Sequence, residues 1–325
     1  MRLMRDSDYK TFEQLCACTQ GGLKATMSKY LRTKYKNIIE TKDYICAEGD
    51  IPIALVAHMD TVFKTPAMEV YYDRQKNVIW SPYGLGADDR AGVFAIIQIL
   101  RQGLRPHVIL TTDEECGALG ATKLAAAGCP FEDLRYVIQL DRRGACDCVF
   151  YDCDNQKFIE YVEDFGFVEA IGSFSDISML CPAWQIAGVN LSVGYYNEHS
   201  VSETLQVGHL LSTIDKVANM LREEVIPSFV YIKAKRAFDW YHWIGKSQTI
   251  DDTHCSNCHR EFKSDELIPV KMINGLISHY CVDCISDASI DFCNKCGEAY
   301  EKNGHEPNEK YGMCEDCFYD GYYNY

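Results

Sequence analysis

Between residues 51 and 222, short apolar strands alternate with helices, and this alternation constrains the fold more than any other feature of the chain. Residues 51–57 form a continuous apolar run, which is typical of a strand buried on both faces. Residues 91–100 and 207–221 have the apolar content and length of helices. Strands that alternate with helices predict an α/β fold, a mostly parallel mixed sheet with helices on both faces.

The same patterns predict further elements on both sides of these segments. Residues 8–36 have helical spacing, with an interruption at Gly21-Gly22. Residues 118–127 form an alanine-rich helix that ends at Gly128, because glycine readily terminates a helix. The remaining strands are expected at residues 37–39, 43–46, 70–72, 77–80, 107–110, 136–140 and 189–193.

The chain of 325 residues divides into three parts by composition. We expect a catalytic domain over residues 1–232, an aromatic segment that packs against it over residues 233–250, and a cysteine-rich module over residues 251–325. No stretch of about 18 apolar residues is present, which argues against a membrane span. The first residues contain no apolar leader, so we expect a cytoplasmic protein.

Ligand-type side chains follow the predicted strands near the points where the strands end. They are His58, Asp60, Asp88, Glu114, Glu115, Asp141 and His199. Taken singly, each has an ordinary interpretation, such as a helix cap or a solvated helix start. Because the carboxyl ends of the strands in such a sheet form one crevice, we expect these groups to converge there. Buried together without a partner they would be unstable, so the pattern predicts a bound cation.

The types of ligand indicate the kind of metal. Counted as one ligand from each of the five places where these residues occur, two histidines and three carboxylates offer nitrogen and oxygen, a set that suits Zn²⁺, Mn²⁺ or Co²⁺. Five ligands exceed the three protein ligands that one catalytic zinc keeps. Two metal ions that share one carboxylate, about 3.5–4 Å apart, would use all five.

Five segments resemble the co-catalytic di-zinc exopeptidases, which include the leucyl-type aminopeptidases, peptidase T and a carboxypeptidase and deacylase group. The segments are LVAHMDTV (residues 55–62), GLGADDRAG (84–92), TTDEECGALGA (111–121), QLDRRG (139–144) and GYYNEHSVSE (194–203). They occur in the same order as in the superfamily, over roughly residues 5–225. The resemblance is specific for the superfamily and does not select one member.

The resemblance implies a role for each ligand. His58, Asp88 and Asp141 would bind one catalytic metal, and Asp88, Glu115 and His199 would bind the other, so that Asp88 bridges the two. The two metals, zinc or alternatively manganese or cobalt, would polarise the scissile carbonyl and lower the pKa of water to about 7.

The resemblance also implies roles for residues beside the ligands. Asp60 would orient the imidazole of His58 through a hydrogen bond. Glu114 would be the general base that takes a proton from a metal-bridging water and passes it to the leaving amine. The peptide bond between Asp88 and Asp89 would be cis.

Three residues near the predicted ligands are candidates for binding substrate. Arg142 and Arg143 directly follow a ligand and would form solvated or structural ion pairs, with recognition of a substrate carboxylate as the alternative. Asp176 would anchor a substrate amine or cap a helix. Only 57 residues separate Asp141 from His199, which leaves no room for the extra domain that some relatives insert there.

Residues 251–325 contain eight of the 17 cysteines, all in C-x-x-C pairs. They are Cys255, Cys258, Cys281, Cys284, Cys293, Cys296, Cys314 and Cys317. This spacing is typical of Cys₄ sites, so we expect two structural zinc ions in a tandem zinc-ribbon-like module. In a sequential arrangement, the first two pairs would bind one zinc and the last two pairs the other. In a cross-braced arrangement, the first and third pairs would share one zinc. The other nine cysteines are expected to stay reduced in the cytoplasm.

Net charge distinguishes this module from the rest of the chain. Residues 251–325 carry a net charge of −9, and residues 1–250 carry −6. Nucleic-acid binding requires a basic face, so the charge argues against DNA or RNA as a partner. A protein partner or self-association through the module fits better, because tyrosines, which are frequent at contacts, gather at residues 319–325.

We therefore expect a di-metal hydrolase of peptide or amide bonds, and foremost an aminopeptidase. One alternative is an N-acyl amino acid deacylase or carboxypeptidase with the same activation of water. A requirement for a free amine or a free carboxylate on the substrate distinguishes these activities. The other alternative is a metal-stabilised scaffold without catalysis, whose zinc module binds a protein partner.

Overall fold

The computed structural model describes residues 2–172, 174–234, 262, 266–271, 277–285, 290–294 and 299–301. The chain divides into two compact units, Met1–Lys235 and Arg236–Tyr325. No helix within the described ranges is long and apolar enough to cross a membrane. The finer domain boundaries expected at residues 232 and 250 stay predictions.

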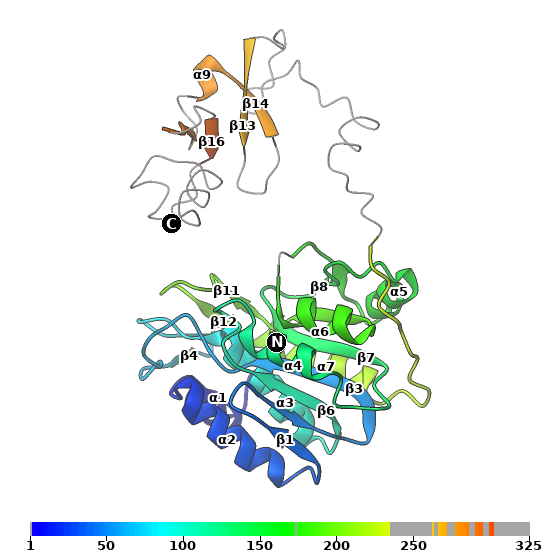
Figure 1. Cartoon of the computed structure of the whole chain (residues 1–325). Helices are drawn as coiled ribbons and strands as arrows, with labels where there is room; N and C mark the ends of the chain where they lie inside the picture. Colours follow the sequence, from blue (N-terminus) through cyan, green and yellow to red (C-terminus); the bar gives the residue numbers. More distant parts are fainter. Residues whose placement is uncertain are drawn as a thin grey trace. The chain divides into compact units, whose positions relative to one another are not determined.

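An eight-stranded sheet forms the centre of the first unit, in the order β1-β2-β6-β3-β7-β10-β8-β9 (Figure 1). The strands are β1 (Ile38–Glu40), β2 (Tyr44–Ala47), β3 (Ile51–His58), β6 (Pro106–Thr111), β7 (Tyr136–Arg142), β8 (Asp147–Val149), β9 (Val168–Glu169) and β10 (Gly188–Ser192). The four central strands, β6, β3, β7 and β10, are parallel. Antiparallel pairs join β1 to β2, β2 to β6 and β8 to β10. The predicted mostly parallel mixed sheet is confirmed.

Helices cover both faces of this sheet, which explains why β3 is apolar throughout. Ile53 and Leu55 belong to the core on one face, and Ala54 and Val56 belong to the core on the other. The first core includes helices α1 (Asp6–Cys16), α2 (Gln20–Arg32), α3 (Ala87–Arg101), α5 (Gln156–Asp164) and α7 (Val207–Met220), and the second includes α4 (Leu119–Ala127) and α6 (Asp176–Trp184). Successive residues of a strand point to opposite faces, so a strand covered on both sides needs apolar side chains at every position.

A second sheet of the first unit has four strands in the order β11-β12-β5-β4. The strands are β4 (Tyr71–Asp73), β5 (Val78–Trp80), β11 (Tyr195–Tyr196) and β12 (Thr204–Gln206). Its inner face, with Ile79, Leu205 and Tyr195, is buried in the first core. Because β5 pairs with β12, the segment that leads to Asp88 lies beside the one that follows His199.

Helix α3 packs closely on strand β7 because residue 92 is a glycine. A Cβ atom at Gly92 would overlap the carbonyl oxygen of Leu140 and would lie 2.5 Å from the carboxylate of Asp89. A side chain at this position would therefore push the helix away from the strand. The close approach sets the relative position of the first turn of α3, which carries Asp88, and the end of β7, which carries Asp141.

The structure confirms the predicted elements and corrects one helix break. Residues 8–36 contain two helices, but the break lies at residues 17–19, and Gly21-Gly22 lie inside α2. Thr19 caps α2 by accepting a hydrogen bond from the N–H of Gly22, and this cap starts the helix before the glycines. Helices α5 and α6 are additional to the predicted elements. The buried residues of α5, Phe158, Ile159 and Val162, do have helical spacing, whereas α6 contains Pro182, which is unfavourable inside a helix.

Two aromatic residues after α7, just before the predicted aromatic segment, pack on the first unit. The ring of Phe229 lies 4.8 Å from that of Phe158 and 5.2 Å from that of Tyr161. The backbone N–H of Tyr231 donates to the carbonyl oxygen of Gln185 at 3.0 Å. Residues 235–250 of the predicted aromatic segment lie outside the described residues.

The described part of the second unit contains a four-stranded sheet in the order β14-β13-β16-β15. The elements are β13 (Leu267–Lys271), β14 (Ile277–Cys281), α9 (Val282–Ile285), β15 (Ile290–Phe292) and β16 (Ala299–Glu301). Cys281 ends β14, Cys284 lies in α9 and Cys293 follows β15, and all three are buried. The other predicted zinc ligands, Cys255, Cys258, Cys296, Cys314 and Cys317, lie outside the described residues.

Replacing Gly92 with alanine tests the close packing of α3 on β7. We expect the free energy of unfolding to fall by about 1–3 kcal/mol, because the added methyl group overpacks the contact. Urea unfolding followed by circular dichroism measures the change. Gly21→Ala is the matched control, since nothing lies within 4 Å of a Cβ atom there and alanine favours the helix. Equal stability of the two variants would contradict the packing argument.

Candidate metal centre

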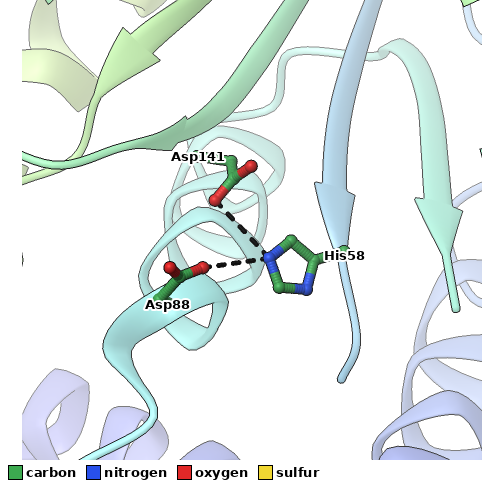
Figure 2. A group of neighbouring side chains, drawn as sticks. All are labelled: His58, Asp88 and Asp141. Carbon is green, nitrogen blue, oxygen red and sulfur yellow. Dashed lines mark hydrogen bonds and ion pairs between the residues drawn. The ribbon is translucent and has the colours of Figure 1, made fainter. Parts of the chain in front are cut away.

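Three ligand-type side chains converge at the carboxyl end of the central strands. His58 is the last residue of β3, Asp141 lies near the end of β7, and Asp88 lies in the first turn of α3. Nε2 of His58 lies 3.0 Å from Oδ1 of Asp88 and 3.5 Å from Oδ1 of Asp141 (Figure 2). All three residues are buried. Strands of the large sheet and one helix therefore deliver a compact set of nitrogen and oxygen atoms.

A second group of ligand-type side chains shares Asp88 with the first. Nε2 of His199 lies 3.3 Å from Oδ2 of Asp88 and 3.0 Å from Oε2 of Glu115. His199 follows β11 with a φ of 60°, in the left-handed region that residues other than glycine rarely adopt. Its side chain is 51% exposed, so this group is open to solvent on one side. Asp88 offers one carboxylate oxygen to each imidazole and thereby links the two groups.

Asp60 connects the first imidazole to the segment that carries the two glutamates. Its Oδ1 lies 3.2 Å from Nδ1 of His58 and accepts the backbone N–H of Glu114 at 3.1 Å. Its Oδ2 accepts the backbone N–H of Glu115 at 3.0 Å. Burial would raise the pKa of Asp60, but the hydrogen bond and charge attraction of His58, together with the backbone N–H groups of Glu114 and Glu115, outweigh this effect, and the pKa is lowered. Asp60 therefore stays ionised and orients both the His58 ring and the backbone of the glutamates.

Three residues that the sequence patterns do not indicate hold the carboxylate of Asp141. The hydroxyl of Tyr195 donates to Oδ1 at 3.1 Å. Ser175 Oγ and Gln139 Nε2 donate to Oδ2 at 2.9 and 3.0 Å. Gln139 lies two residues before Asp141, and the period of two along β7 is the signal that would have placed it on the same face. Tyr195 and Ser175 come from segments whose paths the sequence does not reveal.

The peptide bond between Asp88 and Asp89 is cis, as the resemblance implies. The carboxylate of Asp89 accepts the backbone N–H of His58 at 3.2 Å and that of Gly92 at 2.7 Å. Asp89 therefore ties the end of β3 to the first turn of α3. The two neighbouring aspartates thus have different tasks, since Asp88 faces the imidazoles and Asp89 holds the backbone.

The distances between the ligand atoms fit metal binding. A tetrahedral ion with bonds of about 2.0–2.1 Å holds its ligand atoms about 3.3 Å apart. The contacts of His58 with Asp88 and Asp141 measure 3.0 and 3.5 Å, and those of His199 with Asp88 and Glu115 measure 3.3 and 3.0 Å. Within each group all ligand atoms lie within 4.8 Å of one another. Each group therefore has the size of one metal site, with ligands that suit Zn²⁺, Mn²⁺ or Co²⁺.

The centre contains more negative charge than its own histidines balance. Burial raises the pKa of Glu114 to about 9, of Asp141 to about 6 and of Asp176 to about 7, and neighbouring carboxylates add to each increase. Oε1 of Glu115 is buried without a hydrogen-bond partner among the described residues. Carboxylates that repel one another in a buried site are stabilised by positive charge, and two divalent cations would supply it.

The two arginines predicted to contact substrate differ in their surroundings. Arg143 is exposed and forms an ion pair with Glu198, with 3.0 Å between Nη1 and Oε1. Arg142 donates to the carbonyl oxygen of Ile171 at 3.1 Å. The Nε of Arg142 is buried and has no hydrogen-bond partner within the described ranges.

Asp176, the third predicted substrate contact, is fully buried at the first position of α6. Ser175 provides the capping box of this helix, so Asp176 is not its cap. The hydroxyl of Thr111 donates to Oδ2 of Asp176, whereas Oδ1 has no partner in the part of the chain that the structure describes. Asp176 is thus a buried carboxyl group with a raised pKa that interacts with the charges of His58, Asp141 and Asp60.

The architecture is similar to that of several solved peptidases. A tripeptidase from Staphylococcus aureus superposes with a TM-score of 0.59 at 14% sequence identity, over 68% of this chain and 99% of the other. Aminopeptidase PepT from Bacillus cereus gives 0.52 at 15% identity, over 67% of this chain and 98% of the other. An aminopeptidase from the archaeon Desulfurococcus kamchatkensis gives 0.53 at 13% identity, over 68% and 96%.

By contrast, no protein-family model matches the chain, and no curated protein matches its sequence. The likeness to the solved structures confirms the exopeptidase-type fold that the sequence motifs predict. At 13–15% identity it establishes the fold alone, so the function has to be argued from the residues of the site.

Titration with Mn²⁺ tests whether both groups bind metal. We expect two Mn²⁺ ions per chain, one for each group, because this ion prefers oxygen ligands to thiolates. His199→Ala removes a ligand from one group and should leave one tightly bound ion, whereas Asp88→Ala should weaken both. Electron paramagnetic resonance of the free ion measures the stoichiometry. His209→Ala, which alters a histidine outside both groups, is the control, and equal losses in the two ligand variants would contradict the shared role of Asp88.

Proposed function

We propose that the chain is a metal-dependent hydrolase of peptide bonds, and specifically an aminopeptidase. The observation that carries the proposal is Asp88, whose two carboxylate oxygens face the imidazoles of two ligand groups. His58, Asp88 and Asp141 would hold one divalent cation, and Asp88, Glu115 and His199 the other, with zinc expected and manganese or cobalt as alternatives. The solved proteins of similar fold are a tripeptidase and aminopeptidases, which supports this class of reaction.

Glu114 carries the proton in the proposed reaction. Its backbone is held by Asp60, and its partly buried carboxyl group lies among the charges of the centre, with a raised pKa caused first by burial. When bound, the two cations would polarise the scissile carbonyl and lower the pKa of water. Glu114 would accept a proton from the attacking water and deliver it to the leaving amine. Asp60 would keep the ring of His58 oriented throughout.

Arg142 favours a substrate that carries a carboxylate. It directly follows Asp141, and its Nε lacks a partner among the described residues. It also donates to the backbone of Ile171, which with Tyr151 and Ile177 helps to line a cavity of about 330 Å³. Arg142 would bind the carboxylate of a short peptide while an apolar side chain occupies this cavity. The same contact would serve the alternative function, hydrolysis of an N-acyl amino acid or a carboxypeptidase substrate.

We also propose that the second unit binds two structural zinc ions through its eight paired cysteines. Cys281 ends β14 and Cys293 follows β15, and strands β13 and β16 lie between them. Neighbouring strands are about 4.8 Å apart, so three spacings separate these cysteines by about 14 Å. Two thiolates of one zinc are at most about 4.6 Å apart. The two cysteines would therefore serve different zinc ions, which agrees with both sequential and cross-braced use of the pairs.

The zinc module would bind a protein partner that determines where the hydrolase is located, or it would mediate self-association of the hydrolase. Its net charge of −9 favours a protein partner or self-association over nucleic acid. We propose a cytoplasmic location, because C-x-x-C pairs of this kind hold metal where thiols stay reduced.

The substitution Glu114→Gln tests the proposed catalytic role. We expect hydrolysis of a peptide library to fall by about 100- to 10,000-fold, because the amide cannot accept the proton. Metal content, measured by inductively coupled plasma mass spectrometry, should stay unchanged, since Glu114 is in neither ligand group. Wild-type hydrolysis in the variant would contradict the role of Glu114 as the base. A wild-type chain that hydrolyses no peptide at all would instead favour the scaffold alternative.

Amidated substrates test the proposed role of Arg142. We expect the KM of a short peptide to rise about 10- to 100-fold when its carboxylate is converted to an amide, because a charge-assisted hydrogen bond is lost. Arg142→Met should raise the KM of the free acid to a similar value and leave the KM of the amide unchanged. Arg143→Met is the matched control, because Arg143 already pairs with Glu198. Equal effects of the two substitutions would contradict a specific contact at Arg142.

A further inference from the structure

Glu203 is a buried acidic residue that the proposed chemistry does not use. Its side chain is fully buried, and its carboxylate accepts two backbone hydrogen bonds from the start of α3. Oε2 accepts from the N–H of Gly86 at 2.6 Å, and Oε1 accepts from the N–H of Asp88 at 3.0 Å. No cationic side chain forms an ion pair with Glu203 among the described residues. The backbone N–H groups of Gly86 and Asp88 therefore hold this carboxyl group in place, although burial raises its pKa to about 7.

The start of α3 has no cap of its own, which explains why an acidic side chain is buried there. Gly86 occupies the cap position with a φ of 68° and has no side chain to accept a hydrogen bond. Asp88 and Asp89 have non-helical φ and ψ, so the N–H groups of Gly86 and Asp88 lie before the regular turns of α3 and need an acceptor from another segment. Glu203 supplies the missing acceptor from a position 117 residues further along the chain than Gly86.

The same residue is joined to the loop that carries His199. Glu203 follows His199 by four residues and directly precedes β12. Its backbone N–H donates to the carbonyl oxygen of Ser200 at 3.1 Å, and Ser200 Oγ donates to the carbonyl oxygen of Asn197 at 2.7 Å. These bonds brace the loop, so a displacement of Glu203 is passed on to His199.

We infer that Glu203 is a positioning residue that sets the separation between Asp88 and His199, and thereby shapes the second ligand group. The inference rests on the proposed function in one respect only, which is that the two groups bind metal. Asp88 has to face two imidazoles at once, with contacts of 3.0 and 3.3 Å. Glu203 holds the backbone of Asp88 from one end of a loop whose other end carries His199. One side chain thus fixes the shared ligand and a ligand of the second group to each other.

A helix cap without influence on the metal centre is the competing interpretation. Removal of such a cap would lower the melting temperature and leave the affinity for metal unchanged. A positioning residue, by contrast, changes the affinity and the spectrum of the bound metal even where the fold is intact.

The substitution Glu203→Gln separates these two interpretations. Glutamine keeps the shape of glutamate, but it offers one acceptor oxygen and turns an NH₂ group toward one of the two backbone N–H groups. The matched control is Glu198→Gln, which removes the same charge from the same loop, beside His199. Glu198 pairs with the exposed Arg143 and makes no hydrogen bond to α3 among the described residues. The full-length chain is titrated with Mn²⁺ and observed by electron paramagnetic resonance, which distinguishes a spin-coupled pair of ions from separate ions.

We expect E203Q to bind the second Mn²⁺ about 10- to 100-fold more weakly than the wild type and to lose the spin-coupled signal. E198Q should retain both. A folded E203Q chain with wild-type affinity and a wild-type coupled signal would overturn the inference. Should E203Q fail to fold, Glu203→Asp decides, because the shorter carboxylate keeps the charge but cannot reach both N–H groups. Weaker binding at the second site in that variant supports the inference, and unchanged binding with unchanged coupling overturns it.

Failure of the proposed function would give a different pattern of results. A wild-type chain that binds a coupled pair of Mn²⁺ ions but hydrolyses no peptide contradicts the hydrolase and leaves the role of Glu203 to be decided by the variants above. A wild-type chain that binds no coupled pair contradicts the metal centre and the inference together.

Discussion

Asp88 lies between His58 and His199 and faces each imidazole with a different carboxylate oxygen, at 3.0 and 3.3 Å. This arrangement requires three segments to meet: the end of β3, the start of α3 and the loop after β11. Several contacts in the surrounding structure bring these three segments together. The glycine at residue 92 lets α3 approach β7, Asp89 ties the helix to β3, and the pairing of β5 with β12 brings in the loop of His199.

The two ligand groups are supported in different ways. His58, Asp88 and Asp141 stand on regular elements and are buried, so their positions are determined by the packing of the sheet and of α3. Glu115 and His199 stand on loops, and His199 is half exposed. Solvent reaches the centre from this second side. Rigid support on one side and access on the other are what a centre needs to hold its ligands and still admit a substrate.

Much of the fold and the convergence of the ligand-type side chains follow from the sequence for a physical reason, whereas their division into two groups was implied only by the family resemblance. A strand buried on both faces must be apolar throughout, so polar residues directly after residues 51–57 mark the edge of the sheet. The residues that support the ligands could not be predicted from the sequence in this way. Tyr195, Ser175 and Glu203 act through contacts between segments far apart in the chain, and no local period records such a contact. The break between α1 and α2 was misplaced because a threonine cap, not the glycine pair, determines where α2 begins.

The origin of the ligands along the chain has a consequence for folding. They come from residues 58 to 199, so neither group exists until the central strands, α3 and the second sheet have all assembled. Metal would then bind the native state and not the unfolded chain. Such binding adds free energy to the native state by mass action, about 2.7 kcal/mol when the free ion is at 100 times its Kd. The supply of metal in the cell would thus determine how long the folded chain persists as well as whether it acts.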